Sequence, residues 1–282
     1  MKKLIYKYKN IEGMKLDDKD GLSPYLYWER LKKENFLLHG FSTRLGGVSR
    51  GIYRSMNLSF TNGDDKECVL ENYKRISKAI GFPYESIVSS DQTHTVNVKR
   101  VGKADRGHGI LHPKTFFDVD GMITNDRDVI LATSYADCVP LFIVDKKHRA
   151  IGLSHSGWRG TVGKIGKVTI EKMAEEFGSS AKDLLVGIGP SICVDCYEVS
   201  QDVAEKFIGA FDDTTSIVFP KENGKYQLDL WEANRKIFLE SGVLEENILL
   251  SNLCTFCNQE LLFSHRASKG KRGNLQAFLG IR

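Results

Sequence analysis

Three apolar runs in the middle of the chain constrain its fold more than any other feature. Residues 129–135, 139–144 and 150–153 are rich in Val, Ile and Leu, and only short polar segments separate them. Side chains of these types favour β-strands, and runs this short are typical of strands in a protein core. The sequence therefore predicts a group of core strands at the centre of the chain.

Further strands and several helices flank this central group. Alternating segments predict short strands at residues 4–6 and 36–38, and a Gly-rich stretch over 41–51 predicts a loop. Helices are expected over 70–80 (closed by Gly81), 161–177, 200–211 and 230–242, the last with a capping box at Asp229 and Glu232. Strands and helices distributed in this way predict a mixed α/β fold.

Composition excludes several classes of protein. The 282 residues include 41% hydrophobic and 27% charged residues, which excludes a collagenous, disordered or coiled-coil chain. The net charge of +4 is too small to favour nucleic-acid binding, and no segment approaches the roughly 18 apolar residues of a membrane-spanning helix. With no signal-peptide core and no linker, we expect one cytoplasmic domain over residues 1–282, without nucleic-acid or membrane partners.

Three residues with metal-binding side chains lie at the ends of apolar segments. His94 follows the run 86–90, Cys138 lies between two of the central strands, and His155 follows the third. Strand ends hold side chains firmly at an open edge, where catalytic groups are often found. Two imidazoles and one thiolate would form a zinc site with an open fourth position, at which water becomes acidic near neutral pH. The long spacings match no compact metal motif, so the residues alone leave this site open.

The same residues allow two other kinds of chemistry. Cys138 could be a nucleophile with a His as its base, without any metal. The set also resembles the ligands of a blue-copper centre. The chain has 7 His, whereas a multicopper oxidase needs on the order of ten imidazoles, which disfavours that chemistry.

A Gly-containing string follows the third central strand. It reads His155-Ser-Gly-Trp-Arg-Gly160 and directly precedes the helix expected from Thr161. A helix N-terminus offers free N–H groups to an anion, and Arg159 would lie beside them. Packing of Trp158 and Arg159 at the helix start explains the string equally well.

Two CxxC pairs provide a second metal signal. Cys193 pairs with Cys196, and Cys254 pairs with Cys257. Such pairs can form a structural Cys₄ zinc site, but their separation is well beyond the usual ribbon spacing of about 15–20 residues. We therefore favour ordinary buried thiols over a structural zinc or a facultative disulfide.

A basic segment lies near the C-terminus. Its positive side chains, from Arg266 to Arg272, could bind phosphate or line a cleft. Runs of this kind are more often solvated turns, and we favour a solvated turn for residues 269–272.

Several strings together resemble the YfiH-type laccase-domain family, also called the purine nucleoside phosphorylase YfiH family. The resemblance runs from about Leu37 to the C-terminus, and the strings that carry it are Phe41-Ser-Thr-Arg-Leu-Gly-Gly-Val-Ser, Ser55-Met-Asn-Leu, Gln92-Thr-His94, Ala136-Asp-Cys138-Val-Pro, His155-Ser-Gly-Trp-Arg-Gly, Gly187-Ile-Gly-Pro and Cys196-Tyr-Glu-Val. Two departures are Thr95, where the family has Gly, and the tail from Ser264, which could alter substrate preference. Cys193 and Cys257 are not expected from the family pattern.

The resemblance implies a fold, a metal and an activity. The fold is a single domain of stacked mixed β-sheets flanked by helices, and the metal is zinc held by His94, Cys138 and His155. The activity is phosphorolysis of purine nucleosides (adenosine, inosine, guanosine and methylthioadenosine) to the free base and sugar 1-phosphate, accompanied by adenosine deamination. Family members were formerly called polyphenol oxidases, and some bacterial ones are linked to peptidoglycan editing.

On this basis we assign expected roles to individual residues. Cys138, His94 and His155 are the catalytic and metal-binding residues, with copper less favoured than zinc. Arg44 and Arg159 would bind phosphate through their planar guanidinium groups, and Asn57 would contact the substrate. Asp137 would either orient a metal ligand or have a structural role.

Two alternative functions remain open at this point. They are a metal-free Cys–His hydrolase or deamidase and a non-catalytic peptidoglycan-editing factor. We expect purine nucleosides and phosphate as partners, and a monomer or homodimer.

Overall fold

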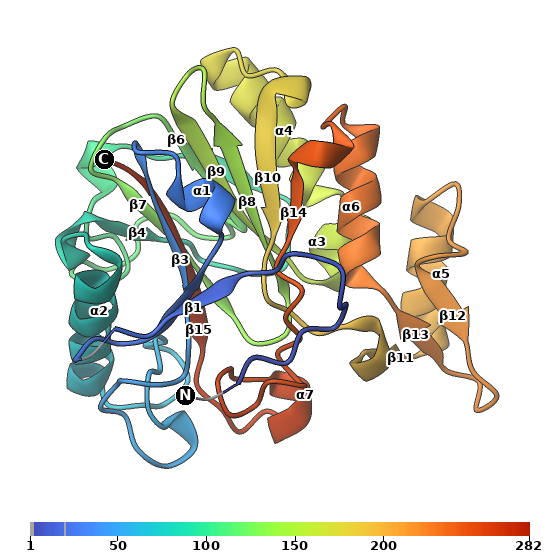
Figure 1. The fold of residues 1–282 in the computed structure, drawn as a ribbon, viewed down its shortest axis with the longest axis horizontal. Coiled ribbons are helices and arrows are strands. Elements are labelled where there is room, and N and C mark those ends of the chain that lie inside the picture. Colours follow the sequence, from blue (N-terminus) through green and yellow to red (C-terminus); the bar gives the residue numbers. More distant parts are fainter. Residues whose placement is uncertain (1–2, 20) are drawn as a thin grey trace.

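The computed structural model describes residues 3–19 and 21–282, and it shows two large β-sheets packed face to face between layers of helices (Figure 1). Helix α2 (Lys66–Ile80) covers the outer face of the first sheet. Helices α4 (Ile165–Phe177) and α6 (Leu230–Glu240) cover the outer face of the second. The mixed α/β fold with stacked sheets is thereby confirmed.

The first sheet has the C-terminal strand β15 near its centre. In spatial order its six strands are β1 (Lys15–Asp17), β2 (Tyr25–Tyr27), β3 (Leu37–Ser42), β15 (Leu275–Ile281), β7 (Ile130–Tyr135) and β4 (Ile87–Ser89). Strand β15 is antiparallel to both β3 and β7, so segments far apart in sequence form its core. Along β15, Phe278 faces α2, whereas Ala277 and Leu279 face the second sheet, which is the alternation expected of a strand buried on both faces.

The second sheet contains the other two central strands. In spatial order its six strands are β14 (Ile248–Leu250), β10 (Leu184–Ile188), β8 (Val139–Asp145), β9 (Ala150–Ser156), β6 (Gly121–Thr124) and β5 (Val98–Arg100). Phe142 of β8 points into the core between the sheets, and its neighbours Leu141 and Ile143 point toward α4 and α6. Burying a side chain such as Phe142 contributes roughly 1.5–3 kcal/mol relative to leaving it exposed.

A smaller sheet lies beside these layers, with α5 (Gln201–Ala210) next to it, at the right of the view in Figure 1. Its strands, in spatial order, are β11 (Glu198–Val199), β13 (Tyr226–Leu228) and β12 (Val218–Pro220). The remaining helices are short: α1 (Glu29–Lys32), α3 (Trp158–Val162) and α7 (His265–Ser268). Among the described residues, no helix combines the length and apolar character needed to cross a bilayer.

Most of the expected elements are confirmed, and two differ. The expected helix over 161–177 is interrupted, because Lys164 has a left-handed backbone (φ 56°) between α3 and α4. The strand expected at residues 4–6 was wrong: Tyr6 forms only an isolated bridge to Leu253. The segment is tied down instead by side-chain contacts such as Asn258 Oδ1 accepting from the Ile5 amide (2.9 Å).

Candidate metal centre and substrate pocket

The structure brings His94, Cys138 and His155 together. One ligand atom from each side chain lies within 4.8 Å of the others. Strands β8 and β9 are antiparallel, with Val139 opposite Ser156, so the start of one strand meets the end of the other. Cys138 immediately precedes β8 and His155 lies near the end of β9, while His94 enters from the turn after β4. These three residues are called the His–Cys–His trio below.

A buried carboxylate, Asp120, organises two members of the trio. Asp120 Oδ1 lies 2.6 Å from His155 Nδ1 and accepts the His94 amide at 3.1 Å. The other oxygen, Oδ2, accepts the amides of Thr93 and Thr95 at 3.0 and 2.9 Å. Asp120 therefore stabilises the turn in which His94 has a left-handed backbone (φ 68°). Because His155 Nδ1 is engaged, its Nε2 is the nitrogen left for a metal.

Gly157 leaves the space in which the trio meets. A Cβ on Gly157 would lie 2.9 Å from His94 Cδ2 and 3.1 Å from Cys138 Sγ. Any side chain at this position would therefore push against two of the three candidate ligands. A glycine at position 157 therefore lets the backbone pass close to the trio. This explains the residue without reference to helix capping.

The electrostatics of the trio favour a thiolate at Cys138. Burial opposes ionisation of Cys138, but His155 and His94 outweigh it and lower the pKa of the thiol to about 6. Burial likewise opposes the charged form of His155, but Cys138 and Asp120 outweigh it and raise the pKa of this imidazole. A thiolate and two imidazoles, one held by a carboxylate, are a suitable donor set for a metal such as zinc.

The trio lies in the wall of a pocket of about 260 Å³. This volume is near the lower end of the range for small-molecule sites, roughly 300–1,000 Å³. The pocket is mostly polar, and its wall includes Gln92, Lys114, Arg272, Asn274 and Gln276. Gln92 is fixed by β7: its amide group accepts from the Ser134 amide (2.6 Å) and donates to the Ser134 carbonyl (2.8 Å).

Three polar atoms on one stretch of the pocket wall are buried without a hydrogen-bond partner among the described residues. They are Arg272 Nε, Asn274 Oδ1 and Gln276 Oε1. Buried polar groups in proteins nearly always have partners, so each of these atoms needs a water or a ligand. The three atoms offer a bound molecule one donor and two acceptors.

The residues expected to bind substrate or phosphate all lie outside the wall of this pocket: Arg44, Asn57, Asp137 and Arg159. The Arg44 guanidinium donates to the carbonyls of Arg54 and Gln259, at 3.0 Å each, and stacks on Phe263. The Asn57 amide donates to Asp64 Oδ2 (2.8 Å), while its oxygen accepts the Asn274 amide (2.9 Å). Both side chains hold loops around the pocket, and neither is among the residues of its wall.

Asp137 and Arg159 lie near the trio but are engaged with the protein. The Asp137 carboxylate accepts the Thr255 hydroxyl (2.6 Å) and the Arg266 amide (2.7 Å), which fits the structural alternative for this residue. The Arg159 side chain is exposed and stacks 4.2 Å from the Trp158 ring. The string at 155–160 was interpreted either as an anion site or as packing at the start of a helix. The stacking of Arg159 on Trp158 matches the second interpretation.

Sequence reasoning missed Asp120 and misplaced Arg272. Asp120 stands directly before the apolar residues of β6, and a lone carboxylate at the start of a buried strand was the available signal. A solvated turn was expected at 269–272, yet Arg272 is half-buried and lines the pocket. The neighbouring Gly273 lies so close to Phe263 that a Cβ there would be 2.8 Å from its ring.

Thr95 shows how the chain departs from the expected Gly after His94. Its hydroxyl donates to Asp120 Oδ2 at 3.1 Å. The side chain thus joins the hydrogen bonds to Asp120, and Thr95 is not among the atoms nearest a Cβ at Gly157. The departure leaves the trio intact.

Comparisons with known proteins identify the family of the chain. The family model described as multi-copper polyphenol oxidoreductase laccase matches residues 38–282. A Bacillus subtilis protein named purine nucleoside phosphorylase YlmD is 35% identical over 257 residues, covering 90% of this chain and 92% of the relative. A protein from an unknown prokaryote, named adenosine deaminase RL5, is 34% identical over 232 residues, covering 81% and 88%.

A solved structure shares the whole fold. The crystal structure of YlmD from Geobacillus stearothermophilus aligns with a TM-score of 0.87 at 33% identity, over 94% of this chain and 98% of that one. Together with the family match over most of the chain, this confirms the resemblance carried by the sequence strings. The chain belongs to the laccase-domain family.

Proposed function

We propose that this chain is a zinc-dependent purine nucleoside phosphorylase with an adenosine deaminase side activity. Its substrates would be adenosine, inosine, guanosine and methylthioadenosine, and its products the free base and a sugar 1-phosphate. Relatives that carry these activity names match the chain over most of its length. The pocket beside the trio supports the proposal with features of this chain's own.

The observation that carries the proposal is the set of unpartnered polar atoms in the pocket wall. Arg272 Nε offers a donor, and Asn274 Oδ1 and Gln276 Oε1 offer acceptors. Phosphate oxygens accept hydrogen bonds, whereas ribose hydroxyls and a purine amino group can donate them. A nucleoside with a phosphate beside it therefore supplies the partners that this wall lacks.

Arg272 replaces Arg44 as the proposed phosphate ligand. Burial lowers the pKa of Arg272, whereas the negative charges of Asp137 and Cys138 raise it. Because Cys138 belongs to the trio, this effect places the Arg272 cation close to the trio. Its planar guanidinium can make two parallel hydrogen bonds to a phosphate. Lys114, paired with Asp91 at 2.7 Å, adds a second positive charge to the wall.

The proposed phosphorolysis forms one bond and breaks another. A phosphate oxygen attacks the anomeric carbon of the sugar, the bond from that carbon to the purine nitrogen breaks, and the purine leaves after taking up a proton. Arg272 would align the phosphate with the anomeric carbon. Holding two reactants in the right orientation lowers the entropic part of the activation barrier. Gln276 and Asn274 would hold the nucleoside by its hydroxyls or its base.

Zinc at the trio would add Lewis-acid chemistry. With three protein ligands a fourth position stays open, where zinc polarises a substrate group or acidifies water, as deamination of adenosine requires. His155 would bind through Nε2 because Asp120 holds Nδ1. Zinc is favoured over copper because a single His₂Cys centre in a chain with 7 His falls far short of a multicopper set.

Turnover of inosine and adenosine, with and without phosphate, tests the proposal on protein whose metal content has been measured. We expect phosphate-dependent release of free base that is lost in Cys138→Ala. Arg272→Gln should raise the KM for phosphate, whereas the exposed neighbour Lys269→Gln should leave it unchanged. Metal-loaded protein that converts no nucleoside would contradict the proposal and would favour a non-catalytic role such as peptidoglycan editing.

A metal-free Cys–His hydrolase or deamidase is the second candidate. The lowered pKa of Cys138 and its contact with His155 are the observation that favours it. Alkylation with iodoacetamide distinguishes the two functions. A metal ligand should be protected until a chelator is added, whereas a free nucleophile should react at once.

The proposal also includes the oligomeric state, the domain organisation and the location of the enzyme. The enzyme would act as a monomer or a homodimer. The core between the sheets joins residues from Met14 to Ile281, which supports one domain over 1–282. We place the protein in the cytoplasm, with purine nucleosides and phosphate as its partners.

A further inference from the structure

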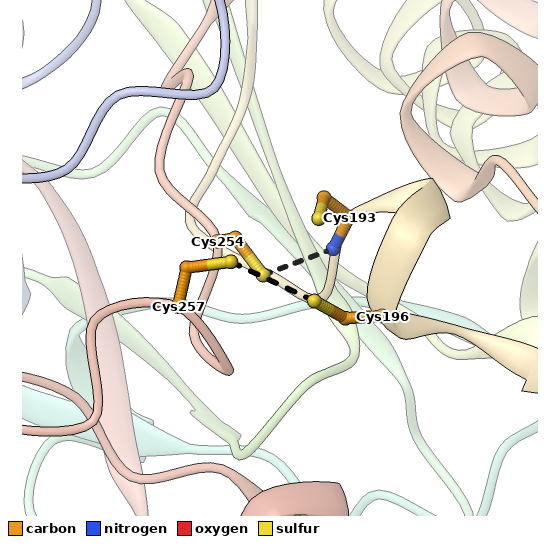
Figure 2. A group of neighbouring side chains, drawn as sticks. All are labelled: Cys193, Cys196, Cys254 and Cys257. Carbon is orange, nitrogen blue, oxygen red and sulfur yellow. Dashed lines mark hydrogen bonds between the residues drawn. The ribbon is translucent and has the colours of Figure 1, made fainter.

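Four cysteines outside the pocket form a second cluster (Figure 2). Cys193 and Cys196 flank a short turn after β10, and Cys254 and Cys257 lie in the turns after β14. Their four sulfur atoms all lie within 4.8 Å of one another. Sequence spacing favoured separate buried thiols, but the fold brings both pairs to the same place. These four residues are called the tetracysteine cluster below.

Backbone contacts hold the two CxxC segments side by side. Ser191 and Cys254 form an isolated parallel bridge, and the Thr255 amide donates to the Ser191 carbonyl at 3.1 Å. The parallel bridge lies two residues before Cys193 and at Cys254 itself, so both turns leave it in the same direction. The long sequence separation of the pairs is therefore no obstacle to a shared site.

The sulfur positions resemble those of a tetrahedral metal site. With zinc–sulfur bonds of about 2.3 Å, the sulfurs of a regular tetrahedron lie roughly 3.8 Å apart. Cys196 Sγ and Cys257 Sγ are 3.6 Å apart, and all six cysteines are unbridged. A disulfide would bring two sulfurs to about 2.05 Å.

Two neighbours of the cluster favour negative charge on sulfur and so oppose burial, which raises the pKa of the Cys196 and Cys257 thiols. The Cys193 amide donates to Cys254 Sγ at 3.3 Å, a contact that stabilises negative charge on sulfur. Lys7 forms an ion pair with Asp195, inside the first CxxC turn, so a cation lies beside the cluster. Cys193 and Cys254 are each 1% exposed whereas Cys257 is exposed, which gives a metal an entry path from the surface.

We propose that the tetracysteine cluster is a structural zinc site with four thiolate ligands. Because every coordination position is taken by the protein, this site supplies no open position for catalysis. It joins the segments that support the loop before Cys138: the Asp137 carboxylate accepts from Thr255, and its carbonyl accepts the Ile192 amide at 3.0 Å. Zinc at the cluster would therefore stabilise the loop that carries Cys138 without contacting the pocket.

Metal stoichiometry tests the site directly. Protein expressed with zinc and purified under reducing conditions should hold one zinc in the tetracysteine cluster in addition to any at the trio. The double variant Cys196→Ser/Cys257→Ser should lose one zinc per chain, and Cys138→Ser should keep this zinc. Cys68→Ser is the matched control, since Cys68 lies on α2 away from both clusters, and it should lose none.

Cobalt substitution identifies the ligands even if a variant fails to fold. Cys138→Ser, whose trio has lost its thiolate, should still show the visible bands of tetrahedral cobalt with thiolate ligands, and the triple variant Cys138→Ser/Cys196→Ser/Cys257→Ser should not. A strong chelator should lower the unfolding temperature of Cys138→Ser, which lacks a trio ligand. Metal content separates the two proposals. If Cys138→Ser binds as much zinc as wild type, the proposal of zinc at the trio is contradicted, whereas the proposal of zinc at the tetracysteine cluster is not.

Three results would overturn the proposal. One is native protein whose four thiols react freely with alkylating reagent while no zinc is bound outside the trio. Another is an intact mass lowered by the hydrogens lost in disulfide formation under the same reducing conditions. The last is a coloured sample that contains iron at the cluster in place of zinc.

Discussion

At the scale of single residues, Asp120 has the widest influence on the trio. It holds the ring of His155 and the turn that carries His94 with one carboxylate. Burial raises its pKa, but His155 and the amides of Thr95 and Thr93 outweigh this effect and lower it. Asp120 is therefore ionised and acts as a fixed acceptor for several donors.

Replacing Asp120 with Asn should weaken metal binding at the trio. One acceptor oxygen becomes an amide donor, so the ring of His155 or the turn of His94 loses its support. Loss of such a supporting hydrogen bond lowers metal affinity on the order of 10–100-fold. Competition with a chromogenic chelator measures the change. Asp128→Asn removes an exposed carboxylate that follows β6 and should bind metal as tightly as wild type; an equal loss in both variants would refute the role of Asp120.

Gly157→Ala tests the space beside the trio. The new methyl group would meet His94 and Cys138 at about 3 Å, closer than carbon and sulfur atoms pack without shifting. We expect the trio to lose most of its metal, measured by elemental analysis of purified protein.

The matched control for that variant is Gly209→Ala. Gly209 lies in α5, and a Cβ there meets nothing within 4 Å. Because Ala favours helices over Gly, this control should gain about 0.5–1 kcal/mol in the free energy of unfolding. Full metal content in Gly157→Ala would contradict the steric argument.

What the sequence could reveal about the site depended on local signals. His94, Cys138 and His155 were found because each stands at the end of an apolar run and within a recognisable string. Asp120 carries no such string, and its role appears only when β6 pairs with β9. That Arg44 and Asn57 lie outside the pocket wall could not be foreseen, because hydrogen bonds to distant loops, such as that from Arg44 to Gln259, have no trace in local sequence.

At the scale of elements, capping residues made the helices predictable. Gly81 ends α2 with a φ of 97°, and Asp229 begins α6 by accepting the Trp231 and Glu232 amides. The start of α2 was expected at residue 70, whereas Asp65 caps it at Lys66 by accepting the Glu67 and Cys68 amides. The break between α3 and α4 was not predicted: Gly163 is the C-cap of α3, but the left-handed backbone falls on the next residue, Lys164 (φ 56°), whose residue type does not signal it. Short edge strands such as β1 were also not predicted. Strand β1 has three residues, and its pairing with β2 determines its conformation more than their residue types do.

Strand β3 carries a buried histidine that should make stability depend on pH. The His39 ring accepts the Trp28 amide at 3.0 Å through Nε2 and is 6% exposed. Burial, with a smaller effect from Lys32, lowers the pKa of His39 to about 3. In the unfolded chain the pKa is about 6.5, so protons bind the unfolded state first as pH falls.

The stabilising effect of neutral His39 is thus complete above pH 6.5 and is lost as pH falls from there toward 3. Between pH 7 and pH 5 it should decrease by about 2 kcal/mol. His39→Gln keeps an acceptor for Trp28 but does not titrate, so the free energy of unfolding of wild type should fall by that much more than that of the variant. Parallel pH profiles in urea denaturation would show that His39 is not the group responsible.

At the scale of the whole molecule, the pocket lies where the two sheets meet. Gln92, Ser134 and Gln276 come from the first sheet or its ends, whereas Cys138 and His155 come from the second. The geometry of the site therefore depends on how firmly the sheets are joined. Apolar packing joins them over most of their area, but it does not fix one strand against another in register.

Tyr135 provides a directional link between the sheets close to the trio. From β7 its hydroxyl reaches Ser154 O of β9 at 3.0 Å and Thr133 Oγ1 at 2.8 Å, and its ring lies 5.5 Å from that of His155. Tyr135→Phe keeps the ring and removes the hydroxyl, which leaves two buried polar groups without this partner. We expect a loss of roughly 1–3 kcal/mol in the free energy of unfolding.

Metal content should not change in Tyr135→Phe, because the hydroxyl contacts no residue of the trio. Tyr84→Phe, a change of the same kind at a half-buried position beside α2, should cost little and serves as the control. The two variants are compared by urea denaturation at pH 7. If Tyr135→Phe were as stable as Tyr84→Phe, apolar packing alone would hold the two sheets together at the pocket.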